Sequence, residues 1–220
     1  MKNVIIFGTG NFAELIYLYL TRDKQYNVSA FTVNQEFLKE DRFLDLPVIP
    51  FEGIQNIYPP TEYLMFIALG YTDMNKKRER VFQKAKNMGY NLLSYIHPST
   101  KTLEGFEMGE NCFVFENNVI QPFVKFGDDV IVWSNNVISH HTTIHDHCFI
   151  VSHVAIAGNV VIEPNCFLGI NSTIRNGVKI ARECVIGAGA VILQDTKERE
   201  VYATNNTEKL NITSDKLKNL

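Results

Sequence analysis

The strongest constraint in this sequence is a six-residue repeat that runs through its second half. From Met108 onward every sixth residue is large and apolar, without a single insertion. The series consists of Met108, Val114, Ile120, Phe126, Val132, Ile138, Ile144, Ile150, Ile156, Ile162, Leu168, Ile174, Ile180, Ile186 and Ile192. A helix repeats every 3.6 residues and an ordinary strand every two, whereas a period of six is typical of a β-solenoid. The repeat therefore predicts a left-handed parallel β-helix.

A second series, two positions before the first, supports a prism-shaped solenoid. Its members are mostly small or β-branched: Val124, Val130, Thr142, Cys148, Val154, Val160, Cys166, Ser172, Val178, Cys184 and Ala190. Three hexapeptides would form one coil of about 18 residues, with the large side chain inside a face and the small one at a tight corner. Stacked coils would pair as parallel strands about 4.8 Å apart. We expect the glycines that follow large positions to occupy turns with positive φ. These are Gly109, Gly127, Gly169 and Gly187.

The four cysteines test this register. Cys148 follows Cys112 by two whole coils, and Cys166 and Cys184 each follow by one more, so all four fall in one column of the prism and would point inward. Such a column could bind a metal or form disulfides, or it could simply be a column of small buried residues, because free cysteine behaves as a small hydrophobe. The sequence has no CxxC pair, and the second interpretation is favoured.

The first half has a different pattern. The apolar run Val4–Phe7 ends in Gly8-Thr9-Gly10-Asn11-Phe12-Ala13, and an amphipathic stretch follows. This order of strand, glycine turn and helix is typical of the first unit of a Rossmann-like domain, in which the glycines and the helix N-terminus favour a phosphate. The motif is also compatible with a tight strand–helix turn that binds nothing.

Further elements follow at intervals expected of a small parallel sheet. We expect strands over 28–32, near Val48, over 64–69 and over 90–96, and a helix over 74–88 that stops at Gly89. His97-Pro98 marks a boundary. The predicted organisation is a Rossmann-like α/β domain over 1–97, a β-helix domain over 98–195, and a tail over 196–220 that ends in a short helix over 214–220.

Histidines carry the chemical signal. Five of the six lie in one short segment of the repeat: His140, His141, His145, His147 and His153. His140 and His141 follow Ile138 by two and three positions, which predicts outward access at a corner. A histidine of near-neutral pKa can accept a proton from an attacking amine or hydroxyl. His145 and His147 are also compatible with solvated side chains on an outer face, and three converging histidines could bind zinc.

At these residues the chain resembles a known family. A Rossmann-like domain followed by a left-handed β-helix, with Ser139-His140-His141 in the middle coils and then Ala157-Gly158-Asn159-Val160 and 165–172, resembles the sialic-acid O-acetyltransferase-type sugar acyltransferases. That family includes bacterial N-acetyltransferases of UDP-, GDP- or dTDP-linked 4-amino sugars in surface-glycan biosynthesis. The resemblance covers essentially the whole chain.

The resemblance implies roles for particular residues of the β-helix. His140 would be the general base on the sugar amine or hydroxyl, which makes His140 and His141 the candidate catalytic residues. The family often has an acidic orienting residue where this chain has His141, so Asp146 or a residue of a neighbouring subunit is expected to orient His140. Gly158 lies one coil after His140 and would present its N–H to the acyl carbonyl.

The resemblance also implies two substrates and an assembly. Acetyl-CoA, as co-substrate, would lie in a groove between adjacent prisms of a homotrimer. Its candidate contacts are Gly158, His153, Gly169, Gly187 and Ala188. A nucleotide-linked sugar would bind the N-terminal domain. Its candidate contacts are Gly8, Gly10, Asn11, Phe12, Thr32, Asn34 and Gly70.

The chain departs from the family at three places. The acidic pair that reads the base in the family is Thr32-Val33-Asn34 here. A histidine that contacts the acyl group is replaced by Phe149. His153 could substitute for that histidine, or it could belong to an outer polar column that contains Asn117, Asn135 and Asn171. The usual glycine- and proline-containing turn near the end is replaced by residues 203–206, Ala-Thr-Asn-Asn.

Composition narrows the function classes that remain. The formal net charge of −3 gives no reason to expect nucleic acid or an anionic membrane as a partner. No apolar run approaches the roughly 18 residues of a membrane span, and residues 1–11 do not resemble a signal peptide, so a cytoplasmic protein is expected. The leading prediction is an acyl-CoA-dependent sugar N-acetyltransferase without a metal, and transfer to a hydroxyl is the alternative within that class. The other classes are a zinc-dependent β-helix hydrolyase and a non-catalytic binding protein.

Overall fold

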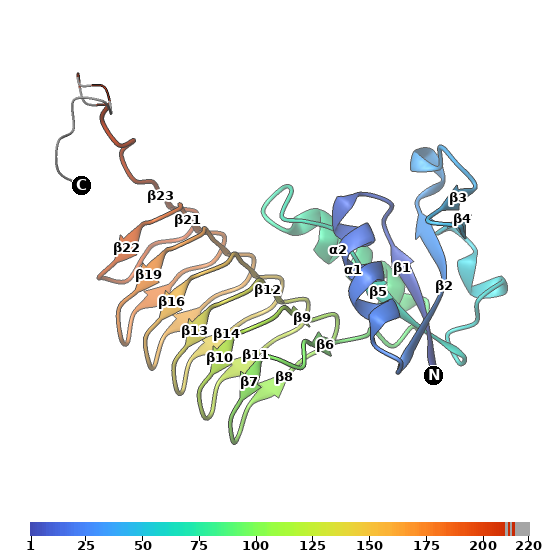
Figure 1. Cartoon of the computed structure of the whole chain (residues 1–220), viewed down its shortest axis with the longest axis horizontal. Helices are drawn as coiled ribbons and strands as arrows, with labels where there is room; N and C mark the ends of the chain where they lie inside the picture. The colour runs from blue at the N-terminus through green and yellow to red at the C-terminus, as the bar shows by residue number, and fades with distance from the viewer. Residues whose placement is uncertain (210, 212, 214–220) are drawn as a thin grey trace.

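The second half of the chain forms the predicted left-handed β-helix (Figure 1). The computed structural model describes residues 1–209, 211 and 213, so the helix expected over 214–220 lies outside the described residues. Each hexapeptide contributes a two-residue strand whose second residue is the large apolar one. That residue points inward and is buried along almost the whole series. Each strand pairs in parallel with the strand one coil further on, as Val137↔Ala155 shows.

The three faces of the prism are three parallel sheets. The β7–β22 face contains β7 (Lys101–Thr102), β10 (Val119–Ile120), β13 (Val137–Ile138), β16 (Ala155–Ile156), β19 (Thr173–Ile174) and β22 (Val191–Ile192). The β8–β20 face contains β8 (Glu107–Met108), β11 (Lys125–Phe126), β14 (Thr143–Ile144), β17 (Val161–Ile162) and β20 (Lys179–Ile180). The β6–β23 face contains β6 (Tyr95–Ile96), β9 (Phe113–Val114), β12 (Ile131–Val132), β15 (Phe149–Ile150), β18 (Phe167–Leu168), β21 (Val185–Ile186) and β23 (Val201–Tyr202).

Between residues 111 and 189, each corner of the prism turns through one residue in the left-handed region. That residue lies three positions after the large apolar one, and the series runs Asn111, Asn117, Phe123, Asp129, Asn135, His141, His147, His153, Asn159, Asn165, Asn171, Gly177, Glu183 and Gly189. Asn, Asp, His and Gly tolerate positive φ better than other residues. The position of His141, His147 and His153 in the histidine-rich segment therefore has a conformational reason as well as any chemical one.

The expectation about the other glycines is wrong. Gly109, Gly127, Gly169 and Gly187 do not have positive φ. They are required for a steric reason, because the neighbouring coil passes directly over them. A Cβ atom on Gly169 would lie 2.7 Å from the backbone nitrogen of Ala188, and one on Gly187 would lie 2.7 Å from the carbonyl oxygen of Tyr202.

The cysteine column has the buried environment that the register predicts. Cys112, Cys148, Cys166 and Cys184 are free thiols inside the prism. Burial raises the pKa of the Cys112 thiol to about 12, so the nucleophilic thiolate is disfavoured there. In the part of the chain that the structure describes, no three His, Cys, Asp or Glu side chains converge as metal ligands.

The N-terminal domain is a five-stranded sheet with a helix on each face. Its elements are β1 (Lys2–Phe7), α1 (Asn11–Arg22), β2 (Tyr26–Val33), η1 (Gln35–Phe37), β3 (Arg42–Phe43), β4 (Leu46–Pro50), η2 (Ile54–Asn56), β5 (Tyr63–Ile67) and α2 (Lys76–Asn87). The strand order is β3-β4-β2-β1-β5, and only the β3–β4 pair is antiparallel. Alternate residues of β1 pack on opposite sides, Val4 and Ile6 with α1 and Ile5 and Phe7 with α2.

The strand expected over 90–96 does not complete this sheet. Only Leu92 bridges to Met65 of β5. Tyr95 and Ile96 form β6, which pairs with β9 of the prism. The hexapeptide register thus extends two strands earlier than Met108, through Ile96 and Thr102.

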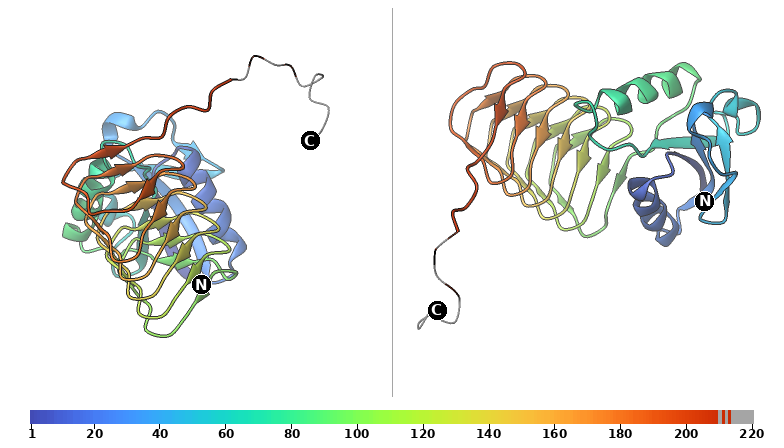
Figure 2. Two further views of the ribbon diagram at one scale, coloured as in Figure 1. Left: turned by 90° about the vertical axis from the view of Figure 1, so that its left-hand side faces the viewer. Right: turned by 90° about the horizontal axis from the view of Figure 1, so that it is seen from above.

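The two parts pack through α1 and α2 against adjoining surfaces of the prism (Figure 2). Phe12 and Tyr19 of α1 cover aromatic residues of the β6–β23 side, including Phe115 and Trp133. Helix α2 lies on one corner column, which we call the docking column. Its members are Asn111, Asp129, His147, Asn165 and Glu183.

Side chains of the docking column bind the N-terminal domain one after another. The Asn111 amide oxygen accepts a hydrogen bond from the Ile67 N–H at 2.8 Å. Arg78 donates from Nε to Asp129 at 2.8 Å, and both side chains are completely buried. Glu183 binds Lys76 at 2.8 Å. His147 is therefore not a solvated histidine, because its Nδ1 lies 2.8 Å from the second carboxylate oxygen of Asp129.

Candidate active site

His140 lies on the corner between β13 and β14, on the exposed side of the prism. Its backbone N–H donates to Oε1 of Gln121 in the preceding coil, at 3.0 Å. Its ring lies directly on Gly158, because a Cβ atom there would be 2.7 Å from Nε2 and 2.6 Å from Cε1 of His140. The stacked coils thus bring together the two residues that the repeat places one coil apart, and only glycine leaves room for the ring.

Gly158 contributes an available backbone donor beside this ring. The residue is buried, and its carbonyl accepts from the Gly177 N–H at 2.9 Å. None of the hydrogen bonds between described residues uses the N–H of Gly158. A free N–H close to a histidine Nε2 can stabilise negative charge that develops on an oxygen bound between them.

The neighbour of His140 on its other ring nitrogen is His141. The two Nδ1 atoms are 3.1 Å apart. Asp146, one of the orienting groups expected from the sequence, is committed elsewhere, because its carboxylate accepts the Asp128 N–H at 2.8 Å. His145 stands exposed on the next corner of the same prism.

The candidate coenzyme A residues other than Gly158 lie at a different corner. His153 lies in the exposed corner column of Asn117, Asn135 and Asn171. Gly169 and the Gly187–Ala188 pair stack on one another at the same corner. This corner and the His140 corner flank the β7–β22 face, so one chain does not bring the two sets together. Phe149 lies on the β6–β23 face, packed between Phe12 and Phe167.

At the carboxyl end of the N-terminal sheet, the glycine turn has the geometry that a phosphate site needs. Gly8 has φ of +120°, and a Cβ atom would lie 2.9 Å from the Ala68 carbonyl oxygen, so only glycine fits. Gly10 is the N-cap of α1 and leaves the first N–H groups of the helix without a side-chain acceptor. The Phe12 ring stacks on Trp133 with centroids 6.2 Å apart.

The remaining nucleotide candidates differ in availability. Thr32 is buried and its hydroxyl donates to the Ile49 carbonyl at 2.8 Å, so it supports β4 rather than a ligand. Asn34 has a buried amide oxygen without a hydrogen-bond partner among the described residues. The carbonyl of Gly70 accepts from Arg78 at 3.2 Å, which ties the end of β5 to the docking column.

A cavity of about 490 Å³ joins several of these residues and adds cations that the sequence did not single out. It is lined by Gly8, Thr9, Asn34 and Phe37, and from α2 by Lys77, Arg80 and Lys84. The three cations recur at intervals of three and four residues, so they share one face of α2. Their spacing in the sequence is the signal that could have identified them.

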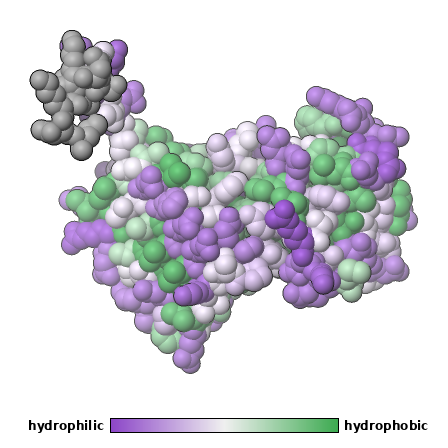
Figure 3. Space-filling model, viewed as in Figure 1, coloured by the Kyte–Doolittle hydropathy of each residue, from purple (hydrophilic) through white to green (hydrophobic). Residues whose placement is uncertain are grey.

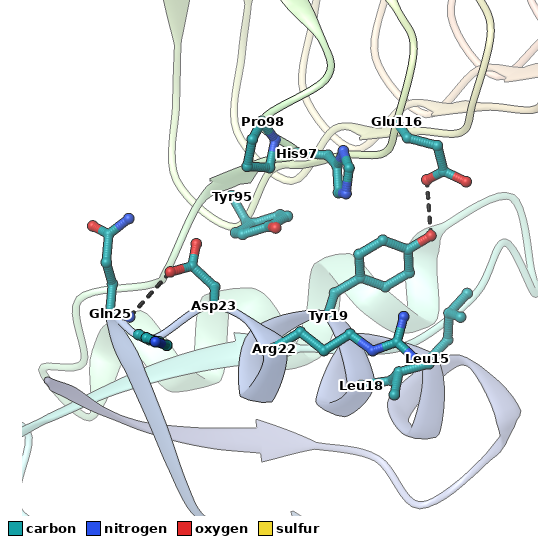
Figure 4. Close-up of a pocket in the computed structure, with 11 residues that line it drawn as sticks. Leu15, Leu18, Tyr19, Arg22, Asp23, Gln25, Tyr95, His97, Pro98 and Glu116 are labelled. Atoms are coloured by element: carbon teal, nitrogen blue, oxygen red, sulfur yellow. Dashed lines mark hydrogen bonds between the residues drawn. The ribbon is translucent and has the colours of Figure 1, made fainter.

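A second cavity, of about 670 Å³, is separate from this one (Figure 4). It lies between the C-terminal half of α1 and the first coils, and none of the candidate residues lines it. Tyr19 reaches across from α1 and donates to Glu116 at 2.8 Å. Burial, with the Glu116 hydrogen bond, raises the pKa of Tyr19 to about 12. Tyr19 is thus a neutral structural link between the two parts of the molecule.

Comparisons with known proteins agree with this architecture. Residues 159–194 match the family model described as bacterial transferase hexapeptide (six repeats). No protein of curated function matches the sequence. No helix in the described part of the chain is long and apolar enough to cross a membrane.

Solved structures match along nearly the whole chain. A variant of GDP-perosamine N-acetyltransferase from Caulobacter crescentus, in complex with CoA and GDP-perosamine, has 24% identity and a TM-score of 0.83, covering 93% of this chain and 94% of that one. The acetyltransferase domain of PglB from Neisseria gonorrhoeae has 20% identity and a TM-score of 0.82, covering 96% and 100%. WeeI from Acinetobacter baumannii has 16% identity and a TM-score of 0.56, covering 92% and 94%. At these identities the likeness establishes the two-part fold.

Proposed function

We propose that the protein transfers an acetyl group from acetyl-CoA to the amino group of a nucleotide-linked amino sugar. The observation that carries this proposal is the contact between His140 and Gly158, which puts an exposed histidine ring against a residue whose N–H has no partner among the described residues. The solved structures of the same fold support it, because one is an N-acetyltransferase with CoA and a nucleotide-linked sugar bound and another is an acetyltransferase domain with acetyl coenzyme A.

The chemistry follows from these two groups. Nε2 of neutral His140 takes a proton from the sugar amine as its nitrogen attacks the thioester carbonyl. The carbonyl oxygen becomes negative and accepts a hydrogen bond from the Gly158 N–H. The C–S bond then breaks, the amide forms, and the proton held by His140 is available to the departing CoA thiolate. An amine acceptor is favoured over a hydroxyl by the N-acetyltransferases among the matching structures.

The exposed β7–β22 face supports a homotrimer in which two chains build each site. Three of its six outward side chains are exposed valines, Val119 (37%), Val137 (44%) and Val191 (59%), and the other three are Lys101, Ala155 and Thr173. Hydrophobic patches interrupt the hydrophilic surface over the prism (Figure 3). Burial of this face between copies would bring the His153–Gly169–Gly187 corner of one chain toward the His140 corner of the next. Coenzyme A would lie along that groove, past the corner that holds Gly169, Gly187 and Ala188.

The nucleotide would bind at the carboxyl end of the N-terminal sheet. The free N–H groups of Gly10–Phe12 at the start of α1 suit a phosphate. Lys77 and Lys84 add positive charge to the adjoining cavity. Asn34, with its unpaired amide oxygen, faces this region in place of an acidic pair.

The test is thiol release from acetyl-CoA in the presence of UDP-, GDP- and dTDP-linked 4-amino sugars, with the product confirmed by mass. His140→Asn should reduce kcat by about 10²-fold or more, the usual scale of general-base catalysis. His145→Asn is the matched control, because His145 is an exposed histidine of the same prism outside the site, and it should retain full activity. Full activity of His140→Asn, or no transfer by the wild-type protein to any amino-sugar nucleotide, contradicts the proposal.

A further inference from the structure

The position after the proposed base holds a second histidine whose geometry assigns it a role. Nδ1 of His141 lies 3.1 Å from Nδ1 of His140, a distance that requires one of the two atoms to carry a proton and the other to accept it. No salt bridge between described residues involves either histidine. Within the described part of the chain, the only other side-chain hydrogen bond to the pair comes from Gln121, which accepts the backbone N–H of His140.

The His141 ring is held in place from the preceding coil. Phe123 lies one coil earlier, and its ring centroid is 4.9 Å from that of His141. Phe123 itself has φ of 63°, an unfavourable value for a bulky side chain, and it lies over Gly105, where a Cβ atom would be 2.6 Å from its ring. The stack of Gly105, Phe123 and His141 therefore fixes one ring, while Gly158 supports the ring of His140.

The two possible proton arrangements have opposite consequences. If His141 donates, the single proton of neutral His140 is on Nε2, and the nitrogen beside Gly158 has no lone pair for an incoming proton. If His140 donates from Nδ1, its Nε2 is free to accept one. Only the second arrangement makes His140 a base at the place where Gly158 offers its N–H.

We propose that His141 is the positioning residue of His140: it accepts the Nδ1–H of His140 and holds it in the tautomer with Nε2 unprotonated. The catalytic role of His141 rests on the proposed transferase function, whereas the hydrogen bond between the two rings does not depend on it. When His140 takes the amine proton, the imidazolium keeps its Nδ1–H bond to neutral His141. When Nε2 releases that proton, the pair returns to its starting state without a net change.

Two variants at His141 distinguish the effect of its hydrogen-bond acceptor from the effect of its side-chain shape. His141→Phe keeps a ring but removes the acceptor, and the corner one coil earlier already holds Phe123 in the same backbone conformation. His141→Gln offers an amide oxygen as acceptor, and a side chain of similar length, Glu183, occupies an equivalent corner. The backbone therefore accommodates both, and equal melting temperatures would show that both are folded.

The direct test is the tautomer of His140, read from long-range ¹H–¹⁵N spectra of full-length protein labelled with ¹⁵N-histidine, with the His140 signals assigned through His140→Asn. At a pH where the ring is neutral, we expect His140 to carry its proton on Nδ1 in the wild type and in His141→Gln. In His141→Phe the proton should move to Nε2. A proton on Nε2 in the wild type, or an unchanged tautomer in His141→Phe, would overturn the proposal.

Kinetics supply the second readout. His141→Phe should lower kcat about tenfold or more with KM for acetyl-CoA unchanged, and His141→Gln should restore kcat to within about threefold of wild type. Equal losses in both variants would contradict the proposal. Because the tautomer measurement needs no substrate, the two hypotheses fail separately. An inactive wild type with the expected tautomer refutes the transferase function alone, and an active wild type with the other tautomer refutes the positioning role alone.

Discussion

His141 and His147 occupy the same backbone position at consecutive corners of the prism, with φ of 57° and 60°. Each places its Nδ1 about 3 Å from one partner, His140 in the first case and Asp129 in the second. His141 stands on an open corner, whereas His147 is buried beneath α2 and contacts Phe82. The repeat thus determines the backbone conformation of each corner residue and the direction of its side chain. Whether the corner is open or covered by α2 then decides if the histidine is available for chemistry or for packing of the two domains.

The prediction with the largest expected effect removes Arg78, the buried cation that α2 places against the docking column. Arg78→Met takes away the cation that pairs with the buried Asp129 carboxylate, so the free energy of unfolding should fall by about 3–5 kcal/mol. Arg80→Met is the matched control, because Arg80 pairs with Asp73 and both side chains are more than half exposed. Its cost should be at most about 1 kcal/mol. Urea denaturation of both variants measures the difference, and equal losses would show that Asp129 is not dependent on Arg78.

A second test replaces each of the two histidines, in separate variants, with phenylalanine. His147→Phe removes a hydrogen bond from the buried Asp129 carboxylate and should cost about 1–3 kcal/mol of unfolding free energy, with acetyl-transfer activity retained in the folded fraction. His141→Phe should change stability by no more than about 0.5 kcal/mol, because its corner is exposed. Denaturation and kinetics on both proteins check this prediction. A stability loss at His141 as large as that at His147 would remove the distinction between the two corners.

The smallest effect concerns Glu183 at the end of the docking column. Hydrogen bonds from Lys76 and then Arg199 hold the pKa of this carboxyl below its ordinary value of 4.5. A lowered pKa in the folded state contributes stability above pH 4.5 that is lost as the pH falls through the folded value. Glu183→Gln should therefore cost about 1 kcal/mol at pH 7 and less at about pH 3. Unfolding curves of wild type and variant at the two pH values measure the difference; an equal cost at both would point to packing rather than charge.

Much of the prism could be predicted because each hexapeptide meets the same surroundings. Ile138 and Ile156 occupy the same buried environment on successive coils, so the need for a large apolar side chain recurs at a fixed spacing in the sequence. The same periodicity predicted the buried cysteine column and the stacking of Gly158 on His140. The left-handed corner residues follow that period too, but they vary among Asn, Asp, His, Glu and Phe, which conceals them.

The docking of the two parts could not be predicted in the same way. Arg78 and Asp129 are 51 residues apart, and neither belongs to a motif that names the other. Tyr95 and Ile96 follow the first domain in sequence, yet they pair in parallel with Phe113 and Val114 of the next coil. Such contacts depend on how the two folded parts pack against each other, and a local sequence pattern does not predict that packing. The sequence did not single out the cations of α2 at Lys77 and Lys84, because their position near Gly8 and Asn34 depends on how the helix packs on the sheet.

The left-handed residue at every sixth position turns the chain by one third of a revolution about the axis of the prism. An insertion of one hexapeptide between the His140 corner and the coils that follow would turn everything after it by a third of a revolution, and the ring would then face a different column. An insertion of about three hexapeptides would leave every column in place and only lengthen the axis. We therefore expect this half of the molecule to tolerate changes of length in whole revolutions.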